Sequence, residues 1–130
     1  MYEIGNAWDR SAITNGVKNG WFVGTPNFIE GGGLRQSQVT QMKWFKHEKG
    51  QVSGEDDASG KPRGASKGRT LSILVKGKFV LWFHTGDGNW VKHTLKQKGD
   101  YAIWGEGVFH KWKAAKKSVV MTVRWQEANP

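Results

Sequence analysis

The second half of the chain is a succession of short apolar runs separated by turns. Each run has four to eight residues rich in β-branched and aromatic side chains, and none keeps the period of a helix. The segments between them carry Gly, Asp, Asn or paired lysines, which is typical of tight connections between strands. The pattern predicts strands at residues 70–75, 79–83, 90–95, 101–104, 108–114 and 118–125. Short strands at such close intervals indicate an all-β sandwich or closed barrel.

The first half is less regular but predicts two further strands, at residues 20–24 and 38–47. In the second of these, the two-residue period of a strand places Gln41, Lys43, Phe45 and His47 on one face. Residues 50–68 contain five glycines and one proline with almost no large apolar side chain, so we expect a flexible loop there. A length of 130 residues suits a single domain, and we assign residues 1–130 to one.

Composition limits the chemistry. The chain has no cysteine, which excludes disulfides, thiolate ligands and cysteine nucleophiles, so a metal ion would need His, Asp or Glu. No serine is set with a base at a recognisable spacing, and catalytic residues remain unassigned. The start of the chain is too polar for a signal peptide and no run is long enough for a membrane span, so we expect a cytoplasmic protein without a membrane partner.

The net charge of +9 is unevenly distributed. Residues 61–117 hold thirteen Lys or Arg against three acidic residues, whereas residues 1–60 are close to neutral, with six basic and seven acidic residues. A basic half with interleaved tryptophans could attract nucleic acid or a phosphorylated small molecule, or its lysines could simply keep the domain soluble. Nucleic acid is the weaker expectation because the positive charge is spread through turns.

The stretch "GDYAIWGEGVFHKW", residues 99–112, carries the most specific signal. A glycine turn precedes His110, and because His110 and Trp112 are two residues apart they point to the same side of a strand, the interior of a barrel. If His47 reaches that interior from a facing strand, the two imidazoles meet. Four tryptophans on or beside predicted strands are most simply core residues, although any that line a cavity could stack on a planar or sugar-like ligand. They are Trp82, Trp104, Trp112 and Trp125.

These motifs resemble those of the cupin superfamily, a jelly-roll barrel, and more narrowly a branch of small bacterial and viral cupin-like proteins of unassigned function. The second cupin motif matches Gly99, Gly107 and His110, with Gly105 where a proline usually stands, and Gly77 matches the glycine that closes the first motif. The resemblance implies a metal site whose ligands here would include His47 and His110. It also places Lys49 where a second histidine is expected and Thr70 where a glutamate is expected, so two of the four family ligands are missing.

Three functions follow from these observations. The first is a single-domain cupin-like jelly-roll, expected as a homodimer, that binds a small polar or anionic ligand in its interior through His110, Trp112, Trp104 and His47, with Lys43 and Arg124 as anion partners. The second is a metal-dependent cupin enzyme, an oxygenase, isomerase or lyase, in which His47 and His110 hold a divalent transition metal; whether any cofactor is present is left open. The third is a nucleic-acid-binding β-barrel.

Overall fold

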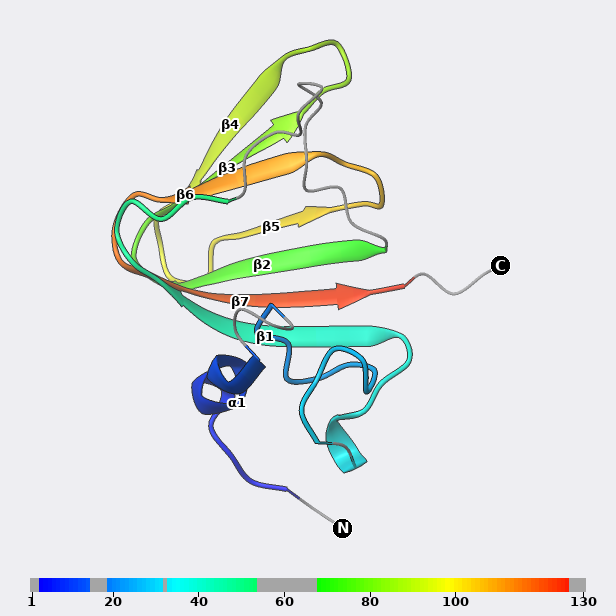
Figure 1. Ribbon diagram of the computed structural model, residues 1–130. Coiled ribbons are helices and arrows are strands. Elements are labelled where there is room, and N and C mark those ends of the chain that lie inside the picture. The colour runs from blue at the N-terminus through cyan, green and yellow to red at the C-terminus, as the bar shows by residue number, and fades with distance from the viewer. Residues whose placement is uncertain (1–2, 15–18, 32, 54–67, 127–130) are drawn as a thin grey trace.

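Two antiparallel β-sheets pack face to face in the computed structural model, which describes residues 3–14, 19–31, 33–53 and 68–126 (Figure 1). The larger sheet has the strand order β1-β7-β2-β5, and the smaller has the order β4-β3-β6. Their strands are β1 (Thr40–His47), β2 (Arg69–Lys76), β3 (Phe79–His84), β4 (Trp90–Leu95), β5 (Tyr101–Trp104), β6 (His110–Ala114) and β7 (Ser118–Trp125). This arrangement is the predicted all-β jelly-roll sandwich.

Most predicted strands are confirmed, and two differ. The run at 108–114 enters the sheet only at His110, because Val108 and Phe109 still belong to the turn after β5. The run at 20–24 forms only isolated bridges, from Val23 to Met42 and from Gly24 to Gln36, so it adds a fragment to the edge of β1 instead of a full strand. The loop predicted at 50–68 lies largely outside the described residues, which resume at residue 68.

A helix, α1 (Ala7–Thr14), occupies the polar opening segment, where the sequence pattern predicted no element. Asn6 caps it, since its Oδ1 accepts a hydrogen bond from the Asp9 amide at 3.0 Å. The helix lies beside β1 (Figure 1), where Ser11 Oγ accepts a hydrogen bond from the Trp44 amide at 3.1 Å. It therefore protects an edge strand that would otherwise expose unpaired amides. None of the helices in the described ranges has the length and apolarity needed to cross a bilayer.

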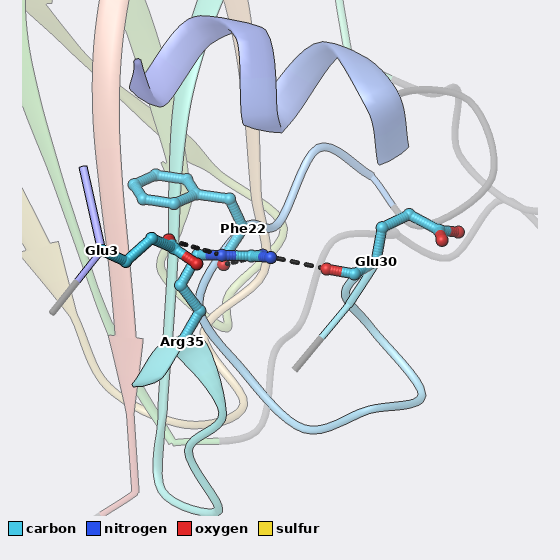
Figure 2. A network of polar contacts seen from close by, with 4 residues as sticks. All are labelled: Glu3, Phe22, Glu30 and Arg35. Carbon is cyan, nitrogen blue, oxygen red and sulfur yellow. Dashed lines mark hydrogen bonds and ion pairs between the residues drawn. The ribbon is translucent and has the colours of Figure 1, made fainter. Parts of the chain in front are cut away.

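Arg35 ties the segment between α1 and β1 together (Figure 2). Its Nε pairs with Glu3 Oε2 at 2.9 Å, while Nη1 donates to the carbonyl oxygens of Phe22 at 3.2 Å and Glu30 at 2.9 Å. A planar guanidinium with several donors in fixed directions suits this kind of junction. These bonds hold the segment that carries Trp21 against the sandwich. Trp21 is only 2% exposed.

Strand register decides what fills the space between the sheets. On the larger sheet, one cross-strand row of inward positions is apolar, with Phe45 opposite Val120 and Val120 opposite Leu74. The next two rows are polar: Lys43, Thr122 and Ser72 form one, and Arg124, Thr70 and Trp104 form the other. Hydrophobic residues therefore close only part of the interior, and the polar rows border the rest.

The hydrophobic core gathers residues of both sheets. Its buried members are Leu74, Phe79, Leu81, Leu95, Trp104, Ala114 and Val120. Phe79, Leu81 and Phe83 alternate inward along β3, which leaves Trp82 on the outer face of the smaller sheet. Trp125 likewise lies on the outer face of the larger sheet, opposite Thr40. The expectation that Trp82 and Trp125 are core residues was wrong, because each falls in the outward phase of its strand.

The outer face of the larger sheet is also apolar. Tyr101 is 64% exposed and Ile103 is 51% exposed on β5, beside Leu71 and Ile73 of β2. Helix α1 lies at the edge of this sheet along β1 and does not reach β5 (Figure 1). A second copy of the chain would bury these side chains, and the homodimer stays a prediction.

The glycine that ends β2 provides a test of the fold. Gly77 has φ +102°, and a Cβ added there would lie 2.7 Å from the Ser118 Cα. Gly77→Ala should therefore combine backbone strain with a clash and lower the free energy of unfolding by about 2–5 kcal/mol. Gly99→Ala is the matched control, because Gly99 has φ +93° with open space around it, and should cost only about 1–2 kcal/mol. Equal losses in denaturant unfolding would contradict the close approach at Gly77.

Candidate ligand-binding cavity

A cavity of about 370 Å³ lies between the two sheets, on the side formed by β1, β7, β2 and β6. This volume is within the usual range of sites for small molecules. The residues that the sequence singled out come from four different strands, yet the structure places all of them around this one cavity. They are Lys43, His47, Trp104, His110, Trp112 and Arg124.

Two cations lie on the same aromatic ring in this cavity. The Lys43 Nζ is 4.6 Å from the centre of the Trp21 ring, and the Arg124 guanidinium carbon is 4.9 Å from it. Burial, together with the positive charge of Arg124, lowers the pKa of Lys43 from 10.5 to about 8. Lys43 also donates to the Asn19 carbonyl oxygen at 3.3 Å. None of the described residues that line the cavity is Asp or Glu, so a positive charge on Lys43 has no carboxylate partner here.

In each of the two predicted histidines, the ring nitrogen Nδ1 makes a hydrogen bond. His110 Nδ1 lies 3.1 Å from the Val108 carbonyl oxygen, and because a carbonyl only accepts, Nδ1 carries the proton. His47 Nδ1 lies 3.2 Å from Gln51 Oε1. Burial lowers the pKa of His47 to about 4 and also lowers the pKa of His110. The two imidazoles are therefore neutral at physiological pH, and each leaves Nε2 with a lone pair.

Aromatic rings form the walls. Trp112 lies between His47, at a ring distance of 4.5 Å, and Phe79, which it stacks on at 5.2 Å. Trp104 contacts His110 at 4.6 Å. His47 and His110 thus line the same cavity, but His47 packs on Trp112 and His110 packs on Trp104. Among the described residues, no ring contact joins the two imidazoles.

Two buried polar atoms in the lining have no hydrogen-bond partner among the described residues. They are Thr70 Oγ1 and Trp104 Nε1, on side chains that are 1% and 8% exposed. By contrast, the neighbouring hydroxyls of Ser72 and Thr122 satisfy each other at 3.0 Å. Buried polar groups are nearly always hydrogen-bonded, so each exception needs an explanation.

Sequence reasoning missed Trp21 and the binding potential of Thr70. Trp21 belongs to an apolar run that was expected to be an ordinary strand, and its place under Lys43 depends on long-range contacts. Thr70 did carry a signal, because Thr70 and Ser72 alternate with Leu71 and Ile73 and so form a polar inward face.

A broader hollow of about 760 Å³ adjoins the cavity and shares four of its lining residues: Asn19, His110, Trp112 and Arg124. Its remaining walls include the uncharged amides of Gln38, Gln41 and Gln126. The four shared residues show that the two spaces are neighbours.

Comparison with known proteins identifies the architecture. No family model matches the chain, and no curated protein matches it either. Solved structures do match. A cupin superfamily protein from Desulfitobacterium hafniense has 17% identity over 71% of this chain and 72% of that one, with a TM-score of 0.54. KdgF from a Halomonas species has 16% identity over 71% and 74%, with a TM-score of 0.55. The Drosophila melanogaster CENP-C cupin domain has 16% identity over 71% and 64%, with a TM-score of 0.54. The chain has a cupin-like fold.

The cupin-like cavity does not offer the ligand set of a metal centre. The described residues contain no group of three or more His, Asp or Glu side chains that could hold a metal ion. The position where the family resemblance places a glutamate holds Thr70, and Lys43 and Arg124 add positive charge to the same cavity. A catalytic zinc or iron site normally has three protein ligands. We therefore derive no chemistry through a metal.

The half-buried Lys43 of the cupin-like cavity yields a stability prediction. Because the folded-state pKa of Lys43 is near 8, the unfolded chain binds more protons between about pH 8 and 10.5, and stability should rise with pH across that window. Lys43→Met removes the buried charge, so it should raise the free energy of unfolding at pH 7 by about 1–3 kcal/mol and abolish the gain at high pH.

Lys46→Met is the matched control. Lys46 lies on the opposite, exposed face of the same strand and also contacts a ring, at 5.1 Å from the centre of Trp8. The control should change stability by less than about 0.5 kcal/mol. Chemical denaturation between pH 6.5 and 10 measures both variants, and a destabilised Lys43→Met protein would show that the lysine is structural.

Proposed function

We propose that this cupin-like protein binds a small organic anion in the cavity between its sheets. The observation that carries the proposal is the position of Lys43, which lies half-buried beside Arg124 and over Trp21. Holding an ammonium group near a second cation costs free energy unless a negative charge compensates it. A carboxylate or phosphate group placed between Lys43 and Arg124 would supply that charge and accept charge-assisted hydrogen bonds from both.

The remaining lining supports binding more than catalysis. The neutral histidines, the tryptophan walls and the paired hydroxyls provide shape and hydrogen-bonding groups. No nucleophile is paired with a base among the described lining residues, so the proposal is a binding function, and a metal-dependent reaction is the weaker alternative.

Titration of the tryptophan fluorescence tests the proposal, because three tryptophans line the cavity. The probes are cyclohexanecarboxylate, D-glucuronate and D-glucose 6-phosphate, each beside an uncharged counterpart, cyclohexanemethanol or D-glucose. At least one anion should bind ten times or more tightly than its neutral counterpart, and Lys43→Met should reduce that affinity about tenfold or more. Equal binding of anions and neutral counterparts, or full affinity in Lys43→Met, would overturn the proposal.

The pKa of Lys43 predicts how this binding depends on pH. With a pKa of about 8 in the free protein, Lys43 loses its charge as the pH rises from 7 to 9.5, so anion affinity should fall by roughly tenfold or more. Lys43→Arg should retain affinity across the range because arginine stays protonated. Titrations at pH 7, 8 and 9.5 measure the effect, and the same decline in Lys43→Arg would assign it to another group.

A second candidate function, binding of single-stranded nucleic acid, is favoured by the outer face of the smaller sheet. Basic residues looked scattered in the sequence, but the pairing of β3 with β4 and β6 sets Trp82 between Lys92 and Lys111. The Lys111 Nζ lies 4.4 Å from the centre of the Trp90 ring and 6.0 Å from that of Trp82. Lysines that lie beside half-buried tryptophan rings on one sheet face suit phosphates and stacked bases.

This candidate predicts salt-dependent binding that does not involve the cavity. A fluorescently labelled oligo-dT of 20 nucleotides should bind with an affinity that falls about twentyfold between 50 and 200 mM salt, as expected for about three phosphate contacts. Lys92→Glu with Lys111→Glu should abolish binding, whereas Lys43→Met should leave it unchanged. Fluorescence anisotropy measures both, and no binding at 50 mM salt would eliminate the candidate.

A further inference from the structure

The cavity offers hydrogen-bonding groups that a bare anion would leave unused. Thr70 Oγ1 and Trp104 Nε1 are buried in its lining without a partner among the described residues. An indole N–H only donates, so the atom that satisfies Trp104 must be an acceptor. A ligand that left both atoms unpaired would gain nothing from them, and burying them costs the fold free energy.

These two groups lie in line with Arg124. In the register of the larger sheet, Arg124 on β7 is opposite Thr70 on β2, and Thr70 is opposite Trp104 on β5. Neighbouring strands lie about 4.8 Å apart, so the row extends over roughly 10 Å between its outer Cα atoms. One compact oxyanion at Arg124 cannot reach the whole row. A ligand with further oxygen atoms spread along one edge can.

His110 requires a ligand group that donates a hydrogen bond, whereas Trp104 requires one that accepts. Its Nδ1 proton is donated to the Val108 carbonyl, which leaves Nε2 as an acceptor. Nε2 makes no hydrogen bond to any residue within the described ranges. A ligand group that donates to it must carry a proton, as a hydroxyl does, and a hydroxyl can at the same time accept from Thr70 or Trp104.

The walls limit the body of the ligand. Trp104 on β5 and Trp112 on β6 both line the cavity, each packed against a further ring. Flat aromatic surfaces suit the apolar C–H face of a saturated ring as well as a planar group. A volume of about 370 Å³ accommodates a single ring with its substituents.

We propose that the ligand is a hydroxylated organic anion, a polyhydroxy ring compound that carries one carboxylate or phosphate group. The oxyanion lies between Lys43 and Arg124, ring oxygens accept from Thr70 Oγ1 and Trp104 Nε1, and a hydroxyl donates to His110 Nε2. This assignment rests on the proposed anion-binding function and specifies its ligand class.

Isothermal titration calorimetry compares three probes. D-Glucuronate and D-glucose 6-phosphate carry hydroxyls with a carboxylate or a phosphate, whereas cyclohexanecarboxylate has the same ring size and charge as glucuronate without hydroxyls. At least one hydroxylated anion should bind tenfold or more tightly than cyclohexanecarboxylate, and the better of the two identifies the anionic group. Equal affinity of cyclohexanecarboxylate and both hydroxylated anions overturns the assignment.

Two variants that each remove one hydrogen-bonding group locate the hydroxyl contacts. Thr70→Val should weaken the preferred hydroxylated anion about five- to tenfold and leave cyclohexanecarboxylate unchanged. Trp104→Phe should act in the same direction, because it removes the N–H and keeps a ring. Ser118→Ala is the control: its buried hydroxyl donates to the Lys116 carbonyl oxygen at 2.7 Å and does not line the cavity, so ligand affinity should change less than twofold although the fold loses stability.

The outcomes separate this inference from the function on which it rests. Anion binding that requires Lys43 but ignores the hydroxyls overturns the ligand class alone. Absence of Lys43-dependent binding for every anion overturns the proposed function as well. Equal weakening by Thr70→Val and Ser118→Ala shows that the cavity responds to general disturbance, which also contradicts the assigned contacts.

Discussion

The two-residue period of strands β1, β7 and β2 is the constraint on which the site depends. Once Phe45 points into the core, Lys43 must point inward as well, and the antiparallel register brings Thr122 and Ser72 beside it. The next row repeats this with Arg124, Thr70 and Trp104. A side chain in these rows cannot turn to solvent without moving its whole strand out of register. The polar interior is therefore fixed by the same pairing that builds the sandwich.

That interior is unfavourable for the fold taken alone. The pKa of Lys43 is lowered to about 8 by burial and by Arg124, and two buried polar atoms lack partners in the described part of the chain. The protein compensates in part through Trp21, whose ring lies against both cations. Trp21 in turn depends on the segment before β1, which Arg35 and α1 hold in place. A segment at the edge of the larger sheet thus supplies part of the cavity wall.

Sequence alone predicted the sandwich, most strands and the inward face of β1 because each follows from a local period. It also named six residues that meet at one cavity, because the position of His110 after its glycine turn and the alternation in β1 fix inward directions. It missed α1, an eight-residue helix whose stability comes from its cap and its contact with β1. It placed Trp82 and Trp125 in the core because tryptophan is a large, mostly apolar side chain. The position of each residue in the two-residue period of its strand decides which way it faces, and both face outward. Trp21 could not be assigned, since its contacts with Lys43 and Arg124 join segments far apart in sequence.

The difference from a metal-binding cupin centres on a few inward positions. Where the family resemblance expects a glutamate, this chain has Thr70, and the row that contains it continues to Arg124. A carboxylate at that position would lie close to two cations and would compensate their charge, which would favour a metal or an internal salt bridge over an external anion. A hydroxyl leaves the positive charge in place and adds a neutral group that can donate or accept. Under the proposed anion-binding function, side-chain replacements on one sheet face are enough to change the charge that a cupin-like cavity favours, because the strand pairing that builds the sandwich does not depend on them.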